Sequence, residues 1–267
     1  MMQTTLQTIL EQKYLAAALV SCGIVVLFAN ALGREAAVVA GNFMYVPTTG
    51  ILLILATVAV FKFGTSGHHG IAWFAFAGYA ASAFTAEMLW IGQEVYLQID
   101  PFPSAADVFY LIGYPFLLMF FIAYLQPVKA GITKKMLAAT SVFSLSVLAL
   151  GLYVTVGNGT DDVFATVVAA IYPVFDSILI VPALIGVALF FKGKVNFMWT
   201  LFCLGTICVF VADAAFLLGQ NEDSYYTGNP AEILFYWNYI LLAFGVKNHT
   251  SLFQSRKKRD GLGALHA

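Results

Sequence analysis

The sequence predicts an all-α, polytopic membrane protein: a bundle of eight transmembrane helices with both termini in the cytoplasm. Three observations predict this class, namely the composition, the spacing of apolar segments and the distribution of charge. Of the 267 residues, 61% are hydrophobic and 10% are charged, and the mean hydropathy is +0.85. Soluble domains carry about 25% charged residues. A chain of this composition therefore cannot cover a water-exposed surface with polar groups.

The apolar residues form eight segments, each near the length of about 20 residues that a helix needs to cross a bilayer core. In chain order they are 14–33, 41–63, 70–91, 105–126, 136–157, 163–191, 197–219 and 231–247. The loops between them are short, so little chain is left for a soluble domain. Any chemistry is therefore expected within the membrane or at its edge.

Lysine and arginine are distributed unequally over the two sides of these segments. If the first segment is entered from the cytoplasm, 12 of the 13 basic residues face inward and only Arg34 faces outward. The inward residues are Lys13, Lys62, Lys129, Lys134, Lys135, Lys192, Lys194, Lys247, Arg256, Lys257, Lys258 and Arg259. The acids on the outer side are Glu35, Glu94, Asp100, Asp107, Asp161, Asp162, Glu222, Asp223 and Glu232. Because cytoplasmic loops are enriched in Lys and Arg, this pattern predicts cytoplasmic N- and C-termini in a cell membrane protein.

Short sequence patterns indicate where several of these segments begin or bend. Ala29-Asn30-Ala31 is typical of a signal peptidase site, but the apolar run before it is long enough to span, so we expect that run to be retained. Segments four and eight each begin with a capping sequence, Ser104-Ala105-Ala106-Asp107 and Asn229-Pro230-Ala231-Glu232. Asp107 and Glu232 are accordingly interpreted as structural acids. In segment six, Pro173 lacks a backbone donor and is expected to loosen the helix near Asp176.

The two halves of the chain resemble each other at a shift of 126 residues. This shift aligns Pro47 with Pro173, Trp73 with Trp199, Phe76 with Phe202, Phe84 with Phe210, Ala86 with Ala212 and Glu87 with Asp213. The last outer loop is one residue shorter than its counterpart in the first half, so the shift beyond it is 125 and aligns Tyr114 with Tyr239. The pattern predicts a four-plus-four parallel repeat, with residues 1–130 and 131–250 as the two repeats and 251–267 as a basic cytoplasmic tail. Because each half has an even number of spans, the halves are expected to be related by an axis along the membrane normal, with a site between them.

Three carboxylates, Glu87, Asp176 and Asp213, fall within the predicted spans. An ionisable group at that depth costs at least about 2.5 kcal/mol, so it usually faces a cavity or a partner. No Lys, Arg or His lies at matching depth in the sequence, so we expect bonds to Tyr, Ser or Thr, or access to water. Two interpretations stay open: the acids tie helices together, or they form a site for a polar ligand or a proton.

Several aromatic residues lie near the outer boundary: Trp90, Tyr96, Tyr225, Tyr226 and Trp237. Such rings commonly anchor at the level of the lipid headgroups, and we expect a belt of this kind. A lipophilic or aromatic ligand held among them is the alternative.

No catalytic residue, cofactor, metal ion or nucleic acid is expected. His68 and His69 are adjacent in a short cytoplasmic loop, and neighbours in sequence do not share a helix face as a metal-binding pair does. His249 falls in the predicted tail. Lys247 lies at the cytoplasmic end of the last segment, where its ammonium reaches water, and not in mid-membrane as a retinal Schiff base requires.

Three stretches carry a resemblance to a known class of protein. They are Pro101 to Pro115 (PFPSAADVFYLIGYP), Tyr172 to Leu179 (YPVFDSIL), and the loop from Gly228 through Asn229, Pro230 and Glu232 to Tyr239. Within residues 70–247 they resemble the multi-pass membrane modules that precede GGDEF, EAL or histidine kinase domains in bacterial signalling proteins, although Glu232 stands where Asp is expected. The resemblance implies a sensor-like module. Since no such domain follows Ala267, it implies output through a separate protein partner.

The sequence therefore predicts a non-enzymatic, sensor-like membrane protein. It is expected to bind a small or lipophilic ligand in a cleft between the repeats, near Glu87, Asp176 and Asp213, and to signal to a partner in the membrane or cytoplasm. A secondary transporter and a non-catalytic subunit of a larger membrane complex are the alternatives. A hydrolase is disfavoured because the carboxylates lack a neighbouring base or metal.

Overall fold

The computed structural model describes residues 2–157, 162–191, 193, 195–222 and 224–263, with the side chains of 2–9, 156, 157, 221 and 253–263 left aside. The side chains of Asp161, Lys192, Lys194, Asp223 and Arg256 to Arg259, which the sequence assigned to one side of the membrane, are not among those described. The helices are α1 (Met2–Leu32), α2 (Arg34–Phe63), α3 (Gly67–Ile91), α4 (Ala105–Leu125), α5 (Lys134–Gly157), α6 (Val163–Phe190), α7 (Asn196–Asn221) and α8 (Ile233–Gly263). Short turns, η1 (Gly92–Leu97), η2 (Gln126–Gly131) and η3 (Pro230–Glu232), join some of them.

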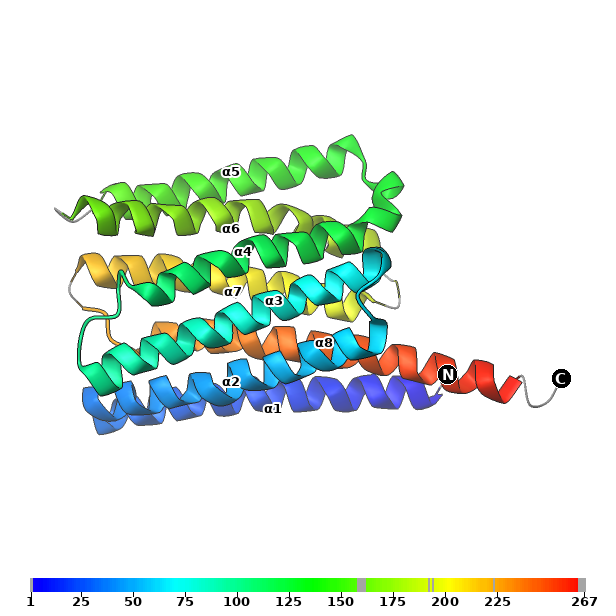
Figure 1. Cartoon of the computed structure of the whole chain (residues 1–267), viewed down its shortest axis with the longest axis horizontal. Coiled ribbons are helices and arrows are strands. Elements are labelled where there is room, and N and C mark those ends of the chain that lie inside the picture. Colours follow the sequence, from blue (N-terminus) through cyan, green and yellow to red (C-terminus); the bar gives the residue numbers. More distant parts are fainter. Residues whose placement is uncertain (1, 158–161, 192, 194, 223, 264–267) are drawn as a thin grey trace.

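The helices run side by side along the long axis of one bundle (Figure 1). The described part of the chain contains no strand, so the all-α prediction is confirmed. The start of α1 and the end of α8 lie at the same end of the bundle, which we call the terminal end; the opposite end is the loop end (Figure 1). Helix α2 packs on α1, α3 and α8, while α4 packs on α3 and α6.

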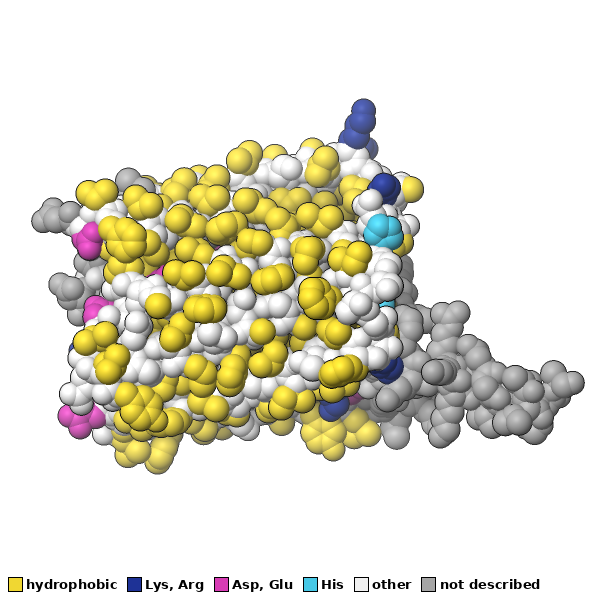
Figure 2. All heavy atoms as spheres, in the orientation of Figure 1, with side chains coloured by type: hydrophobic (Ala, Val, Ile, Leu, Met, Phe, Trp, Pro, Cys, Tyr) yellow, Lys and Arg dark blue, Asp and Glu magenta, His cyan; other side chains and the backbone are white. Residues whose placement is uncertain are grey.

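Seven helices in the described chain, α1 to α7, are long and apolar enough to cross a membrane. Helix α8 runs beside them in the bundle, but its apolar part, 231–247, is shorter. Figure 2 shows hydrophobic side chains over the middle of the visible face, acids at the loop end and basic groups toward the terminal end. The structure is therefore that of a helical bundle with a surface suited to lipid.

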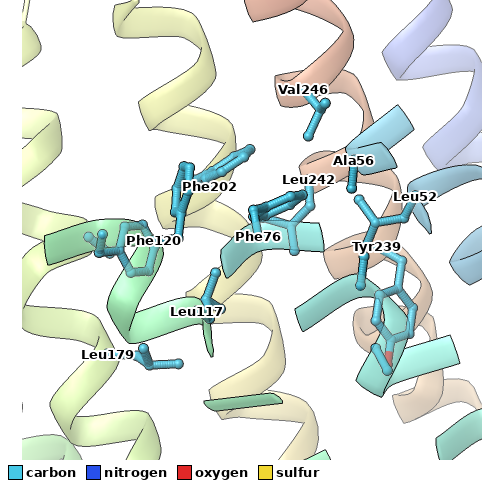
Figure 3. Packing of buried hydrophobic residues seen from close by; sticks show 14 of the residues in the cluster. Leu52, Ala56, Phe76, Leu117, Phe120, Leu179, Phe202, Tyr239, Leu242 and Val246 are labelled. Atoms are coloured by element: carbon cyan, nitrogen blue, oxygen red, sulfur yellow. The ribbon is translucent and has the colours of Figure 1, made fainter. Parts of the chain in front are cut away.

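The core is built from aromatic rings. Trp73, Phe76, Phe120, Trp199 and Phe202 are all fully buried, and Figure 3 shows Phe76, Phe120 and Phe202 close together. The rings of Phe76 and Phe202 stack with centroids 5.2 Å apart and planes 18° apart. Such ring pairs stabilise a core beyond the area they bury.

The helix starts follow the predicted caps. Ser104 Oγ accepts from the Ala106 amide at 3.1 Å, and Asp107 Oδ2 accepts from the Ser104 amide at 2.7 Å, so the capping box is confirmed. Asn229 caps Ala231 at 2.8 Å, but it begins the turn η3, after which α8 starts at Ile233. Although Pro173 was expected to loosen its segment, α6 continues through it.

Candidate functional site

A cavity of about 100 Å³ lies toward the loop end, between α2, α3, α4, α6, α7 and α8. A water molecule needs only about 10–15 Å³ on this scale, so the space accommodates a small organic molecule or several waters. Four carboxyl side chains line this central cavity: Glu87, Asp107, Asp213 and Glu232. The other lining side chains are mostly aromatic, and they include Tyr79, Trp90, Tyr110, Tyr114, Tyr172 and Tyr239.

Two of the predicted site residues, Glu87 on α3 and Asp213 on α7, face this cavity. Tyr239 of α8 donates to Glu87 Oε1 at 2.8 Å, and Tyr114 of α4 donates to Asp213 Oδ2 at 3.0 Å. Each bond joins a carboxyl group of one half of the chain to a hydroxyl of the other half. The four residues are two of the aligned pairs found in the sequence, so the two contacts are reciprocal.

The third predicted residue, Asp176 on α6, lies behind the cavity wall and is 1% exposed. The hydroxyl of Tyr114 lies 2.9 Å from Asp176 Oδ1 and is also within hydrogen-bond distance of Asp213. The carboxyl groups of Asp176 and Asp213 also contact each other. The structure thus brings Asp176, Tyr114 and Asp213 into one group. The expectation that the buried acids bond to tyrosine is confirmed for all three.

The acids interpreted as purely structural have a second role. Asp107 does cap α4, but its Oδ1 also accepts from Tyr172 at 2.6 Å, and the side chain lines the cavity. Glu232 accepts from Tyr225, from Tyr236 at 3.2 Å and from the Gly228 amide at 2.8 Å. Sequence spacing revealed the caps and not the cavity. The partner of Asp107, Tyr172, comes from a distant segment, whereas Tyr225 and Tyr236 lie within seven residues of Glu232.

A second hollow, which we call the loop-end basin, lies between the central cavity and the loop end of the bundle. It is lined by Arg34, Glu94, Asp100 and Tyr226 among others, and it shares Trp90 and Tyr225 with the cavity. These two rings therefore lie between the basin and the cavity. The Trp90 indole donates to Thr227 Oγ1 at 3.1 Å and lies 3.2 Å from Glu94 Oε2.

The predicted aromatic belt is wrong for part of its members. Trp90 is buried in the cavity wall, and Trp237 is half-buried and donates to the Leu19 carbonyl of α1 at 3.1 Å. Burial first, and then the charge of Glu232, raise the pKa of Tyr225, so its hydroxyl keeps its proton. Tyr96, at 74% exposed, fits an interfacial position.

The terminal end holds a histidine pair that the sequence did not reveal. His249 was assigned to a tail, but it is fully buried on α8, and its Nε2 lies 3.2 Å from His69 Nε2 of α3. The Trp73 indole donates to His69 Nε2 at 3.2 Å, so that nitrogen is an acceptor of the Trp73 proton. Within the described residues no cluster of three metal-ligating side chains is found.

Comparison with known proteins finds no family model, no curated protein and no solved structure that matches this chain. The function is therefore inferred from the geometry of the cavity. The cavity brings carboxyl and phenol groups around one space, which suits it to bind a small polar or cationic molecule, or protons, between the two halves.

Proposed function

We propose that this chain is an integral membrane, sensor-like protein that binds a small ligand in the central cavity and signals to a separate protein partner. The observation that carries the proposal is the pair of reciprocal bonds, Tyr239 to Glu87 and Tyr114 to Asp213, around the central cavity. A ligand in that space competes for the same oxygens. Because the bonds join the two halves, occupancy alters how firmly the halves are held together, and a ligand shifts an equilibrium only through such differential contacts.

The proposal includes an orientation in which the loop end faces outward and α8 is the eighth span. Lys62 lies at the end of α2, Lys129 in η2, and Lys134 and Lys135 at the start of α5, all toward the terminal end of the bundle. Lys247 lies within α8, one turn before Thr250, whose carbonyl accepts from Lys62. Arg34, in contrast, begins α2 at the loop end. The positive-inside rule then favours a cytoplasmic terminal end. The loop-end basin would open to the outside, and a ligand would reach the cavity past Trp90 and Tyr225.

The proposal also includes the four-plus-four duplication. Two observations support it: the stacking of Phe76 on Phe202 and the exchange of carboxyl and phenol partners between the halves. Aligned residues touch each other directly only where two repeats meet at a twofold axis. A ligand site close to that axis is typical of membrane proteins built from repeats.

Binding to the cavity can be tested through Trp90, whose indole lines the wall. The purified protein in lipid nanodiscs is titrated with a panel of small amines, alcohols, carboxylic acids and aromatic compounds while tryptophan fluorescence is recorded. The proposal expects a saturable change for at least one class, absent in Trp90→Phe.

A cavity-filling variant supplies the control. Ala83 lines the cavity from α3, and Ala81 on the same helix is exposed on the outer surface of the bundle. Ala83→Leu is expected to abolish the response and Ala81→Leu to preserve it. Equal responses in the two variants would place the binding elsewhere and contradict the proposal.

A transporter is the second candidate, and the group of Asp176, Tyr114 and Asp213 favours it. Asp176 lies near the middle of α6, where a carboxyl group can pass a proton between the cavity and the terminal end. Proton or substrate flux in proteoliposomes that Asp176→Asn abolishes would support transport over sensing. Fixed-stoichiometry purification with a membrane enzyme would instead support a subunit role.

A further inference from the structure

The central cavity is rich in acids and has no basic counterpart. Four carboxyl groups line it, and none of the described residues in its wall is Lys, Arg or His. The guanidinium of Arg34 belongs to the loop-end basin, where it donates to the Tyr225 carbonyl at 3.2 Å. The described wall of the cavity therefore concentrates carboxyl groups with no basic side chain beside them.

The hydrogen bonds around Tyr114 leave one corner, at Asp176 behind the cavity wall, short of a proton. A phenol has one hydrogen to donate, yet Tyr114 lies within bonding distance of both Asp176 and Asp213, at 2.9 and 3.0 Å. Oδ2 of Asp176 is buried with no N–H or hydroxyl donor on it among the described residues. Two ionised carboxylates in contact disfavour each other. This corner therefore requires an additional proton or a cation.

Aromatic rings form most of the remaining wall. Tyr79, Trp90, Tyr110 and Tyr172 face the same space as the acids. The faces of such rings attract cations, most strongly where water is excluded, and quaternary ammonium groups are commonly held in aromatic cages. A hydrated metal ion does not exploit these faces, whereas an organic cation uses both the rings and the carboxylates.

The volume limits the size of the ligand. A cavity of about 150 Å³ accepts benzene. In proportion to the six carbons of benzene, the ≈ 100 Å³ of this cavity suits about four non-hydrogen atoms, so the roughly five of a tetramethylammonium ion are near its upper limit.

We infer that the ligand of the central cavity is a small organic cation, an amine or quaternary ammonium compound, held by Glu87 and Asp213 among the tyrosine and tryptophan rings. This inference rests on the proposed function, because it names the chemical class that the same cavity takes. The cation supplies the charge that the wall lacks, and its alkyl groups contact the rings.

Four probes separate charge from shape: tetramethylammonium, tert-butylammonium, tert-butanol and acetate. tert-Butylammonium and tert-butanol have nearly the same size and shape, but the first carries a charged ammonium where the second carries a neutral hydroxyl. Binding is measured by Trp90 fluorescence and by calorimetry on the whole chain in nanodiscs. The inference expects both ammonium ions to bind at least about tenfold more tightly than tert-butanol, in line with the cost of losing a buried charge partner.

Variants test which groups carry the selectivity. Asp213→Asn and Glu87→Gln, made separately, are each expected to weaken tetramethylammonium binding at least about tenfold and to leave tert-butanol unchanged. Glu35→Gln, the same kind of change at an exposed acid at the loop end, is the matched control and should bind as the native protein does. The two cavity variants change residues on different helices. If one of them misfolds, the other still shows whether a cavity carboxyl group contributes to ammonium binding.

The outcomes separate this inference from the proposed function. If tert-butanol or acetate binds as tightly as the ammonium ions and Ala83→Leu abolishes that binding, the cavity binds ligands but the cation class is wrong. The inference is also overturned if ammonium binding is unchanged in both Asp213→Asn and Glu87→Gln. If none of these probes and none of the wider panel binds saturably, the proposed function fails as well.

Discussion

Replacing Gly41 by Ala tests how the loop above the central cavity is held. Gly41 of α2 lies against Gly228, and a Cβ added at Gly41 would lie 2.5 Å from the Gly228 Cα and 2.7 Å from its amide nitrogen. Ordinary contacts begin near 3.4 Å, so the two backbones must separate by about 1 Å. Overpacking of this kind typically costs about 1–3 kcal/mol.

The separation should also weaken the bonds that hold this loop. Asn30 donates to the Gly228 carbonyl at 2.7 Å, the Gly228 amide donates to Glu232 at 2.8 Å, and Tyr236 donates to the Gly41 carbonyl at 3.0 Å. Gly41→Ala should therefore lower the free energy of unfolding by about 1–3 kcal/mol. It should also increase hydrogen exchange in residues 224–232.

Gly50 on the same helix provides the matched control. A Cβ there would meet only Phe84 Cε2, at 3.7 Å, which is an ordinary contact. Since Ala favours a helix over Gly by about 1 kcal/mol, Gly50→Ala should be neutral or stabilising. Thermal unfolding in mild detergent measures both variants. If Gly41→Ala unfolds at the same temperature as Gly50→Ala, with no change in loop exchange, the close approach of the two glycines is wrong.

Three further predictions concern packing, cross-half bonding and pH. Gly186→Ala should cost at least about 1–3 kcal/mol, seen as a lower melting temperature, because the new Cβ would lie 2.1 Å from the buried indole of Trp199. Tyr239→Phe removes the donor to Glu87 and should cost about 0.6–1.7 kcal/mol, with less than additive loss when combined with Glu87→Gln in a double-mutant cycle. Burial lowers the pKa of His249 from 6.5 to about 3, so its neutral form is favoured in the fold and stability should fall as pH drops below 6.5. A denaturation series across that range should show the loss, and His249→Phe should flatten it.

The sequence predicted the helices well because the signals for them are local. Segment length, apolar composition and the cap at Ser104 to Asp107 all act over a few turns of chain. The three intramembrane acids were also detectable, because a buried carboxylate is costly wherever its helix packs.

The partners of those acids were harder to predict. Tyr114 and Tyr239 could be noticed only as aligned residues of the repeat, and nothing local indicated that each reaches an acid in the other half. Asp107 was interpreted as a cap because its second bond comes from Tyr172, 65 residues away. His69 and His249, 180 residues apart, meet only because α3 and α8 both pack on α2. Side-chain networks of this kind depend on tertiary packing, which a pattern in one segment does not reveal.

The central claim is that a ligand between the halves changes their arrangement, and a distance measurement tests it most directly. Lys129 in η2 and Lys247 in α8 are exposed and belong to different halves. Spin labels are attached at these positions through Lys→Cys changes, in a background with Cys22, Cys203 and Cys208 replaced by Ala. The distance distribution is recorded with and without saturating amounts of the panel compound that binds most tightly. The account predicts a shifted distribution, absent in Ala83→Leu; an unchanged distribution at full occupancy would contradict it.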